Sequence, residues 1–365
     1  QLGLTSFTIY DSNSDVGGTW LANTYPGCAC DIMSHLYSFS FELNPEWSYN
    51  YAPQPEIWAY LKNVAKKYDL YTHIRFETQV QKLTWDENQR KWIVSLRHKN
   101  SKIEEEVFDV IINGPGPLRL PHIPPEFNSF KGPIIHSADW NPNIPLEGKI
   151  VGVIGSGASA IQIIPSIAPR VQELHTYQRK PAWVMSRPQF KFPQLVKSIF
   201  SHFPLFMWLY RTIIFLFNEL KFFAFPNSLS NQWGKKAAQS YLKKQFPGNE
   251  FLQNALTPNY SFGCKRICPS NDYYPALALP HVKLHRGKIV RVESDALCTE
   301  DGRQKIDILI LATGYRVHDY FAPMEVIGRD SENVLSRWKK EGPRTYLGIV
   351  GSSTPNHFFL LGPNT

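Results

Sequence analysis

The sequence predicts an α/β fold with two sheet-containing domains and a block of helices inserted in the second domain. Three observations predict it. Short apolar strands lead into glycine-rich turns at two places, around residues 17 and 155. Prolines at positions 115, 117, 121, 124 and 125 form a linker between these places. Between residues 188 and 262 the strand–turn pattern stops, and the chain becomes rich in Phe, Leu, Ile and Trp.

Local patterns predict four further elements. Residues 56–68 have helical spacing, with their apolar residues on one face. The runs 78–85 and 92–97 predict a hairpin joined by the polar turn 86–91. The apolar runs 109–116 and 307–315 predict buried strands.

The composition agrees with a folded protein of two domains. Of the 365 residues, 43% are hydrophobic, which is enough for one large or two medium cores. The net charge is +8, but the basic residues occur as scattered pairs without interleaved aromatic residues. This pattern predicts a solvated surface and does not favour a nucleic-acid partner.

Cysteine usage predicts a reducing compartment. An odd number of cysteines in a long chain favours free thiols, so we expect a cytoplasmic protein. No histidine stands at the spacing of a zinc-binding motif, and no metal site is predicted. The five cysteines are Cys28, Cys30, Cys264, Cys268 and Cys298.

The turn near residue 155 predicts a Rossmann-like dinucleotide site. An apolar strand over 149–154 runs directly into a GxGxxA sequence, and a helical run follows. The first glycine allows a tight turn, the second lets the backbone approach a pyrophosphate, and the small sixth residue lets helix and strand pack closely. The helix N-terminus is then expected to face the phosphates. The residues predicted at this site are Gly155, Ser156, Gly157, Ala158, Ser159, Ala160 and Gln162.

The next strand indicates which dinucleotide binds. It covers 173–178, ends in Gln178 and is followed by Arg179. A site for NAD usually has Asp or Glu here, whereas Arg suits the 2′-phosphate of NADP. We therefore expect NADP, with Gln178 and Arg179 among its contacts. The alternative is a strand-to-helix turn without a ligand.

The first domain carries part of a second dinucleotide motif. A β-prone run over 6–10 ends at Asp11, which is followed by a turn containing Gly17 and Gly18. This looks like the second strand of a Rossmann unit, in which Asp11 bonds an adenosine ribose. The strand and GxGxxG turn that should come first are not in the sequence. We therefore expect that some tens of residues are missing at the start, and that the C-terminus is also cut.

Two long motifs carry a family resemblance. Residues 17–31 match the pattern [AG]GxWxxxx[FY]P[GM]xxxD of the Baeyer–Villiger monooxygenases at every specified position. The other fingerprint of that family, FxGxxxHxxxW, is present with Asn141 as a departure after it, and Ala29 stands where many relatives have Arg. Its residues are Phe130, Gly132, His136 and Trp140. The resemblance extends over essentially the whole chain, and residues 25–42 look like a subgroup that oxidises large ketones.

The resemblance implies FAD and NADPH as cofactors and a discontinuous FAD domain over 1–117 and 308–365. The NADP domain is then 118–307, with a helical insertion over about 188–262. The implied reaction inserts one oxygen atom of O2 into a ketone to give an ester or lactone. The substrate is expected to be bulky, such as a polyketide of secondary metabolism. The FAD contacts carried over are Asp11, Gly18, Thr19, Trp20, Asp31 and Tyr37.

The resemblance also assigns roles near residue 266. Lys265 is expected to help hold NADP, and Arg266 to be the active-site cation that Asp31 orients. A permanently charged guanidinium suits the anionic species of such a reaction. His136 is as readily a structural residue of the linker as a catalytic one.

The inserted helices leave several interpretations open. The run 195–225 is interrupted by Lys197, Arg211, Glu219 and Lys221, so no transmembrane helix is expected. Its aromatic face walls a substrate pocket, rests on a membrane or is an ordinary helix core. For the whole chain, the alternatives are a flavin monooxygenase acting on nitrogen, sulfur or aromatic carbon, and an inactive fragment. The oligomeric state stays open.

Overall fold

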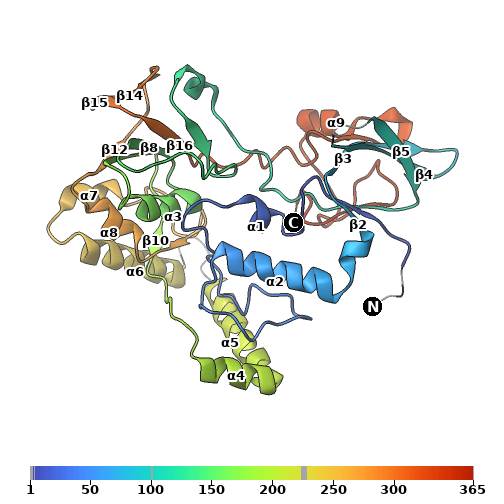
Figure 1. Cartoon of the computed structure of the whole chain (residues 1–365), viewed down its shortest axis with the longest axis horizontal. Coiled ribbons are helices and arrows are strands. Elements are labelled where there is room, and N and C mark those ends of the chain that lie inside the picture. Colours follow the sequence, from blue (N-terminus) through green and yellow to red (C-terminus); the bar gives the residue numbers. More distant parts are fainter. Residues whose placement is uncertain (1–2, 4, 100–101, 223–227, 365) are drawn as a thin grey trace. The chain divides into compact units, whose positions relative to one another are not determined.

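The computed structural model describes residues 3, 5–99, 102–222 and 228–364 (Figure 1). They fall into two compact units. The first unit consists of Gln1–Leu21, Leu61–Pro121 and Tyr315–Thr365, and the second of Ala22–Tyr60 and His122–Gly314. Helix α2 (Gln54–Lys67), close to the helix expected over 56–68, supplies residues to both.

The first unit is built on a four-stranded sheet in the order β17-β3-β4-β5. β3 (Thr78–Asp86) and β4 (Lys91–His98) form the hairpin that the sequence predicts, with the polar turn between them. β5 (Ile103–Phe108) is antiparallel to β4, and β17 (Glu325–Ile327) is parallel to β3. Trp92 is fully buried, and its indole Nε1 donates a hydrogen bond to the Pro355 carbonyl at 2.7 Å.

The remaining elements of the first unit are short. Two parallel strand pairs, β1–β2 and β6–β18, accompany the sheet. The bounds are β1 Ile9–Tyr10, β2 Ile74–Arg75, β6 Ile111–Asn113, β18 His357–Phe359, α9 Val334–Glu341 and the 3₁₀ turns Leu70–His73 and Arg329–Ser331; α1 is Thr19–Ala22, whose last residue belongs to the second unit.

The strand expected to be buried over 109–116 is shorter and more exposed than predicted. Only Ile111–Asn113 is a strand, and Ile112 is 66% exposed. β6 pairs with β18, and one face of this pair carries Ile112 and its register partner Phe358, which are both exposed. The apolar residues of this run are therefore not buried on both faces of the strand.

The second unit is built on a five-stranded parallel sheet in the order β12-β9-β8-β16-β7. Its central strands are buried on both faces, as in other parallel sheets. α3 (Ala158–Ile167) follows β8 directly and lies beside the sheet (Figure 1). The strands are β12 Val282–Arg286, β9 Glu173–Gln178, β8 Ile150–Ile154, β16 Ile308–Leu311 and β7 Ile134–His136.

The expected domain boundary at residue 308 lies elsewhere. β16 is hydrogen-bonded between β8 and β7, so it belongs to the sheet of the second unit. The chain enters the first unit again only at Tyr315. The stretch 22–60 also belongs to the second unit, although the sequence placed it in the first domain. The sequence showed a buried strand over 307–315 but not which sheet it joins.

Helices dominate the rest of the second unit, in agreement with the predicted insertion. The small strands form the pair β10–β11 and the antiparallel sheet β13-β14-β15. The helices are α4 Gln194–His202, α5 Pro204–Phe222, α6 Leu229–Gln245, α7 Glu250–Ala255 and α8 Tyr273–Leu277, with a 3₁₀ turn at Pro125–Ser129. The strands are β10 Val184–Met185, β11 Cys268–Pro269, β13 Arg291–Val292, β14 Ala296–Thr299 and β15 Gly302–Lys305.

The apolar run on α4 and α5 is only partly buried. α5 is apolar around most of its circumference, yet only Met207 and Ile214 are buried among its residues up to 219. The predicted aromatic run extends to residue 225, and its part from 223 to 225 lies outside the described residues. Most of the described run faces outward.

We predict that the centre of the sheet in the second unit carries much of its stability. Leu309 in β16 is fully buried, so Leu309→Ala removes buried methyl groups and leaves a cavity. We expect a loss of about 2–5 kcal/mol in the free energy of unfolding, measured by urea denaturation. Ile134, its register partner in edge strand β7, is 37% exposed and provides the matched control. Ile134→Ala should cost about 1 kcal/mol or less. Equal losses in the two variants would contradict this account of the sheet.

Candidate functional site

The turn between β8 and α3 has the backbone that a dinucleotide turn requires. Gly155 has φ +130°, and a Cβ atom there would lie 2.4 Å from the Ala312 carbonyl oxygen. Only glycine fits. Gly157 begins α3 as its N-cap with φ −83°, and no side chain caps the helix there. Nothing lies within 4 Å of the Cβ that Gly157 lacks, so the space in front of the helix N-terminus is open.

The same turn is tied to the end of β9. The Ser156 hydroxyl donates a hydrogen bond to the Lys180 carbonyl at 2.6 Å. Arg179 and Lys180 are both exposed, whereas Ala160 is fully buried, as the close packing of helix and strand requires. The uncapped N–H groups at the start of α3 are thus linked to a segment with two cationic residues. This arrangement suits the binding of phosphate groups.

Two glutamines predicted to contact NADP make hydrogen bonds within the protein. Gln178 is buried, and its Nε2 donates to the Ala255 carbonyl at 3.3 Å. The amide of Gln162 is engaged with Ala29, accepting from its backbone N–H at 3.4 Å and donating to its carbonyl at 2.9 Å, and it also accepts from Tyr25 Oη at 2.9 Å. Both amides bond protein groups in this structure, and their role as NADP contacts stays a prediction.

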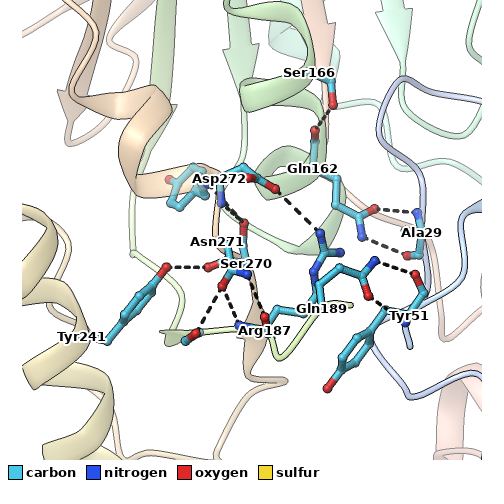
Figure 2. Close-up of polar contacts among 12 residues, drawn as sticks. Ala29, Tyr51, Gln162, Ser166, Arg187, Gln189, Tyr241, Ser270, Asn271 and Asp272 are labelled. Atoms are coloured by element: carbon cyan, nitrogen blue, oxygen red, sulfur yellow. Dashed lines mark hydrogen bonds and ion pairs between the residues drawn. The ribbon is translucent and has the colours of Figure 1, made fainter. Parts of the chain in front are cut away.

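Figure 2 shows how the stretch 22–60 is fastened to the rest of the second unit. Gln162 on α3 bonds both backbone groups of Ala29, as a neighbouring strand would. Gln189 does the same for Tyr51, accepting from its N–H and donating to its carbonyl, both at 2.9 Å. Gly27 packs so closely on α3 that a Cβ would lie 2.2 Å from Ser166 Oγ. These contacts hold the loop that carries Asp31.

Asp31 and Arg266 form the ion pair that the sequence predicts. Arg266 Nε donates to one carboxylate oxygen of Asp31 and its terminal Nη2 to the other, so the pair is bidentate. The hydrogen bond with Asp31 raises the pKa of Arg266. The Asp31 side chain is 14% exposed and that of Arg266 is 65% exposed. A largely buried carboxylate therefore fixes an accessible cation in one orientation.

The groups around this pair are neutral or cationic. Burial raises the pKa of the Cys30 thiol to about 12 and that of the Cys268 thiol to about 11, so both stay protonated at neutral pH. Lys265 is exposed, with its Nζ 4.9 Å from the centre of the Tyr260 ring. Arg266 and Lys265 thus present two adjacent positive charges.

The motif FxGxxxHxxxW has a structural place in the fold. Phe130 lies in the core beside Leu309, and a Cβ at Gly132 would lie 2.7 Å from the Asp307 carbonyl oxygen. Trp140 is half-buried. His136 is buried at the end of β7, where Nδ1 accepts from the Ala138 N–H at 3.0 Å.

His136, at the end of β7, lies next to the turn after β16. This position favours a structural role for His136 over a catalytic one. Its Nε2 is 3.3 Å from Thr313 Oγ1, and Thr313 in turn donates to the His122 carbonyl. Burial lowers the pKa of His136, so the ring is neutral at neutral pH. The histidine therefore links the start of the second unit's sheet to the turn after β16.

The expected FAD contacts are divided between the two units. Asp11, Gly18, Thr19 and Trp20 belong to the first unit, and Asp31 and Tyr37 to the second. Within the first unit, Asp11 Oδ1 accepts hydrogen bonds from the backbone N–H and the side-chain amide of Asn13, both at 2.9 Å. Gly18 has φ +49°, which suits a turn before α1. Tyr37 is exposed. Their role as FAD contacts stays a prediction.

The sequence did not predict the next group of residues, apart from Gln162. A cavity of about 310 Å³ lies next to the fastened loop and is lined by Tyr51, Gln162, Arg187, Gln189 and Asp272, among others. The Arg187 side chain is 16% exposed, lies 3.7 Å from an Asp272 carboxylate oxygen and has no hydrogen bond at Nε (Figure 2). Arg187 and Gln189, polar residues at the start of an apolar insertion, were the sequence feature that could have indicated this cavity.

The family follows from comparison with known proteins. Residues 9–346 match the sequence pattern of a protein family described as flavin-binding monooxygenase-like. The chain belongs to this family. A Baeyer–Villiger monooxygenase of Pseudomonas aeruginosa is 38% identical over 371 residues, which are 100% of this chain and 69% of that protein. The FAD-binding monooxygenase ktnD of Aspergillus niger is 36% identical over 372 residues, 99% of this chain and 61% of the relative.

Solved structures of flavin-binding monooxygenases agree with the fold. The open crystal structure of cyclohexanone monooxygenase has a TM-score of 0.84 at 26% identity and covers 98% of this chain and 78% of that one. Oxidized steroid monooxygenase bound to NADP has a TM-score of 0.84 at 27% identity, with coverage of 98% and 76%. The predicted α/β fold with Rossmann-like domains is therefore confirmed. This flavin-binding monooxygenase-like chain spans about two thirds of the length of its curated relatives.

We predict different effects for the two glycines of the dinucleotide turn. Gly157→Ala should fold normally, because its φ suits alanine and its Cβ meets no protein atom. Its methyl group enters the space in front of the helix N-terminus, so affinity for NADP should fall at least tenfold, measured by calorimetric titration of the chain. Gly155→Ala should lower the unfolding temperature as well, because its Cβ clashes with Ala312. Unchanged NADP affinity in Gly157→Ala would remove this turn from the binding site.

Proposed function

We propose that this chain is an FAD- and NADPH-dependent monooxygenase of the Baeyer–Villiger type, which inserts one oxygen atom of O2 into a ketone to give an ester or lactone. The Asp31–Arg266 pair carries the proposal, since it is an accessible, permanently charged fork held by a largely buried carboxylate. Relatives named Baeyer–Villiger monooxygenase in Pseudomonas aeruginosa and Streptomyces coelicolor support it.

The residues at the β8–α3 turn fit NADPH. The uncapped N-terminus of α3 and the open space at Gly157 suit a pyrophosphate. Arg179 and Lys180 are exposed beside it, as a 2′-phosphate requires, and Lys265 adds a third cation. The FAD contacts expected from the family resemblance are Asp11, Gly18, Thr19 and Trp20 in the first unit and Asp31 and Tyr37 in the second. When bound, the two cofactors supply the hydride and the chemistry that activates O2.

Arg266 would act on the ketone. When a new C–O bond forms at a carbonyl carbon, negative charge develops on the carbonyl oxygen, and a fixed cation stabilises it. The bidentate contact with Asp31 uses Nε and one terminal nitrogen, so the other terminal nitrogen can donate to that oxygen. The raised pKa keeps the guanidinium charged at any working pH. Asp31 is then a positioning residue.

We predict that Arg266→Ala reduces ester formation roughly 100- to 1000-fold, the usual cost of removing one group that stabilises a developing oxyanion. NADPH should still reduce the bound flavin, because hydride transfer does not develop charge at this carbonyl. The two rates are measured separately, by stopped-flow absorbance of the flavin and by mass spectrometry of the product.

The conservative variant Arg266→Lys tests the geometry as well as the charge. It keeps the positive charge but cannot bond both oxygens of Asp31, so we expect an intermediate rate. Normal ester formation in Arg266→Ala would exclude Arg266 from the reaction, whereas loss of flavin reduction as well would indicate a role in cofactor binding.

The proposed substrate is a bulky apolar ketone, such as a polyketide of secondary metabolism or a steroid. Residues 25–42 resemble the subgroup that oxidises large ketones. One similar structure is a steroid monooxygenase, although others are cyclohexanone monooxygenases, which argues that the fold accommodates both sizes. A ketone panel of increasing ring number tests this preference.

We predict that Arg179 sets the preference for NADPH over NADH. Arg179→Ala should raise the KM for NADPH about 10- to 100-fold and leave the KM for NADH nearly unchanged, because only NADPH carries the 2′-phosphate. Initial rates of flavin reduction with each nucleotide measure this. Arg170, an exposed arginine paired with Glu147 in the same unit, is the control, and Arg170→Ala should change neither value. An equal loss with both nucleotides in Arg179→Ala would contradict the assignment.

A further inference from the structure

α4 and α5 expose many large apolar side chains. Several large apolar side chains on these helices and at the residue between them are between 51% and 72% exposed, six of which define the surface. Isolated exposed apolar residues are common, but a group of six on two consecutive helices marks an interaction surface. We name this surface the α4–α5 face and define it by Leu195, Phe203, Leu205, Phe206, Trp208 and Ile213.

The other side of these helices is held by aromatic packing. His35 is buried, with its ring centre 4.8 Å from that of Phe192, 5.2 Å from Phe200 and 5.2 Å from Tyr210. Phe200 lies on α4 and Tyr210 on α5, so both helices are anchored to the loop that contains His35. The α4–α5 face is therefore not needed to attach the helices to the second unit.

Polar side chains on these helices are turned back onto the helix backbone. Thr212 Oγ1 donates to the Trp208 carbonyl at 2.9 Å, and Asn218 Nδ2 donates to the Ile214 carbonyl at 2.9 Å. His202 Nδ1 is 2.9 Å from the Ser198 carbonyl. Hydroxyl and amide groups that bond the preceding turn do not need water, which suits an apolar environment.

The net positive charge of the segment 188–249 indicates which kind of apolar environment it suits. From residue 188 to residue 218 the sequence contains no Asp or Glu but has Lys191, Lys197 and Arg211. α6 adds four exposed lysines, Lys235, Lys236, Lys243 and Lys244, and the whole stretch 188–249 has one acidic residue, Glu219. Apolar surface together with an excess of cations is complementary to an anionic bilayer, whose headgroups attract Lys and Arg.

The shape of the two helices suits shallow insertion. Among the described residues, no single helix is both long and apolar enough to cross a bilayer. α4 and the part of α5 from Pro204 to Glu219 pass that test only as a pair bent by 109°. In Figure 1 the pair lies well away from the five-stranded sheet of its own unit. The bend places Phe203 between the helices and leaves Trp208, a residue type favoured at the membrane interface, on the outer side.

We propose that the α4–α5 face docks this chain onto the surface of an anionic lipid bilayer, with its apolar side chains entering the boundary between headgroups and acyl chains and the cations of the segment 188–249 binding the headgroups. This docking is independent of the reaction proposed above.

Flotation of the purified chain with lipid vesicles tests the proposal. Vesicles of phosphatidylcholine mixed with phosphatidylserine should carry the chain upward in a density gradient, and vesicles of phosphatidylcholine alone should carry much less. Phe206→Gln with Trp208→Gln should weaken binding to the mixed vesicles at least tenfold, equivalent to about 1.4 kcal/mol. The matched control is Ile103→Gln with Val107→Gln, two comparably exposed apolar residues on β5, and it should bind as the unchanged chain does.

A second pair of variants tests the electrostatic part. Lys235→Gln with Lys236→Gln should reduce binding to the mixed vesicles severalfold and leave binding to phosphatidylcholine unchanged. Lys339→Gln with Lys340→Gln, exposed lysines on α9, change the net charge equally and should have little effect. Thermal unfolding of each variant checks that it is folded, so a loss of binding is not a loss of structure.

Three results would overturn the proposal. One is the absence of binding to mixed vesicles by the unchanged chain. Another is equal binding by the Phe206 and Trp208 variant and its control. The third is self-association in analytical ultracentrifugation that the Phe206 and Trp208 variant abolishes, without vesicle binding, since the occupant of the face would then be a second copy of the chain.

Discussion

The candidate active site depends on how two glutamine side chains hold a loop without regular structure. Gln162 and Gln189 each bond both backbone groups of one loop residue, in addition to the isolated antiparallel bridges between Ala29 and Pro53 and between Tyr49 and Lys191. Backbone amides that leave water need such partners, because a buried unpaired group costs about 1–3 kcal/mol. Asp31 follows Ala29 by two residues, so its position relative to Arg266 depends on this attachment.

Sequence patterns located the elements that follow local rules. The hairpin of β3 and β4, the strand β9 and the turn with Gly155 are set by alternation, by β-branched residues and by a required φ, all of which are visible in the residues themselves. The Asp31–Arg266 pair came instead from the family resemblance. No local rule connects residues 235 positions apart in the chain.

The features that could not be predicted from the sequence depend on long-range packing. β16 reads as a buried strand from its own residues, but its place between β8 and β7 depends on partners more than 150 positions away. The hydrogen bonds of Gln162 with Ala29 and of Gln178 with Ala255 join residues 133 and 77 positions apart in the chain, which no local pattern predicts. The exposure of α5 was likewise invisible, since an apolar helix has the same composition in a core and on a surface.

The Asp31–Arg266 pair also bears on how this scaffold can be recombined. Both residues, the loop that carries one of them and the glutamines that hold that loop belong to the second unit. The proposed catalytic cation and its carboxylate partner therefore lie in the same unit as the turn proposed to bind NADP. A chimera that exchanges the first unit for that of a relative would inherit these residues intact, and its altered selectivity would be attributable to the exchanged unit.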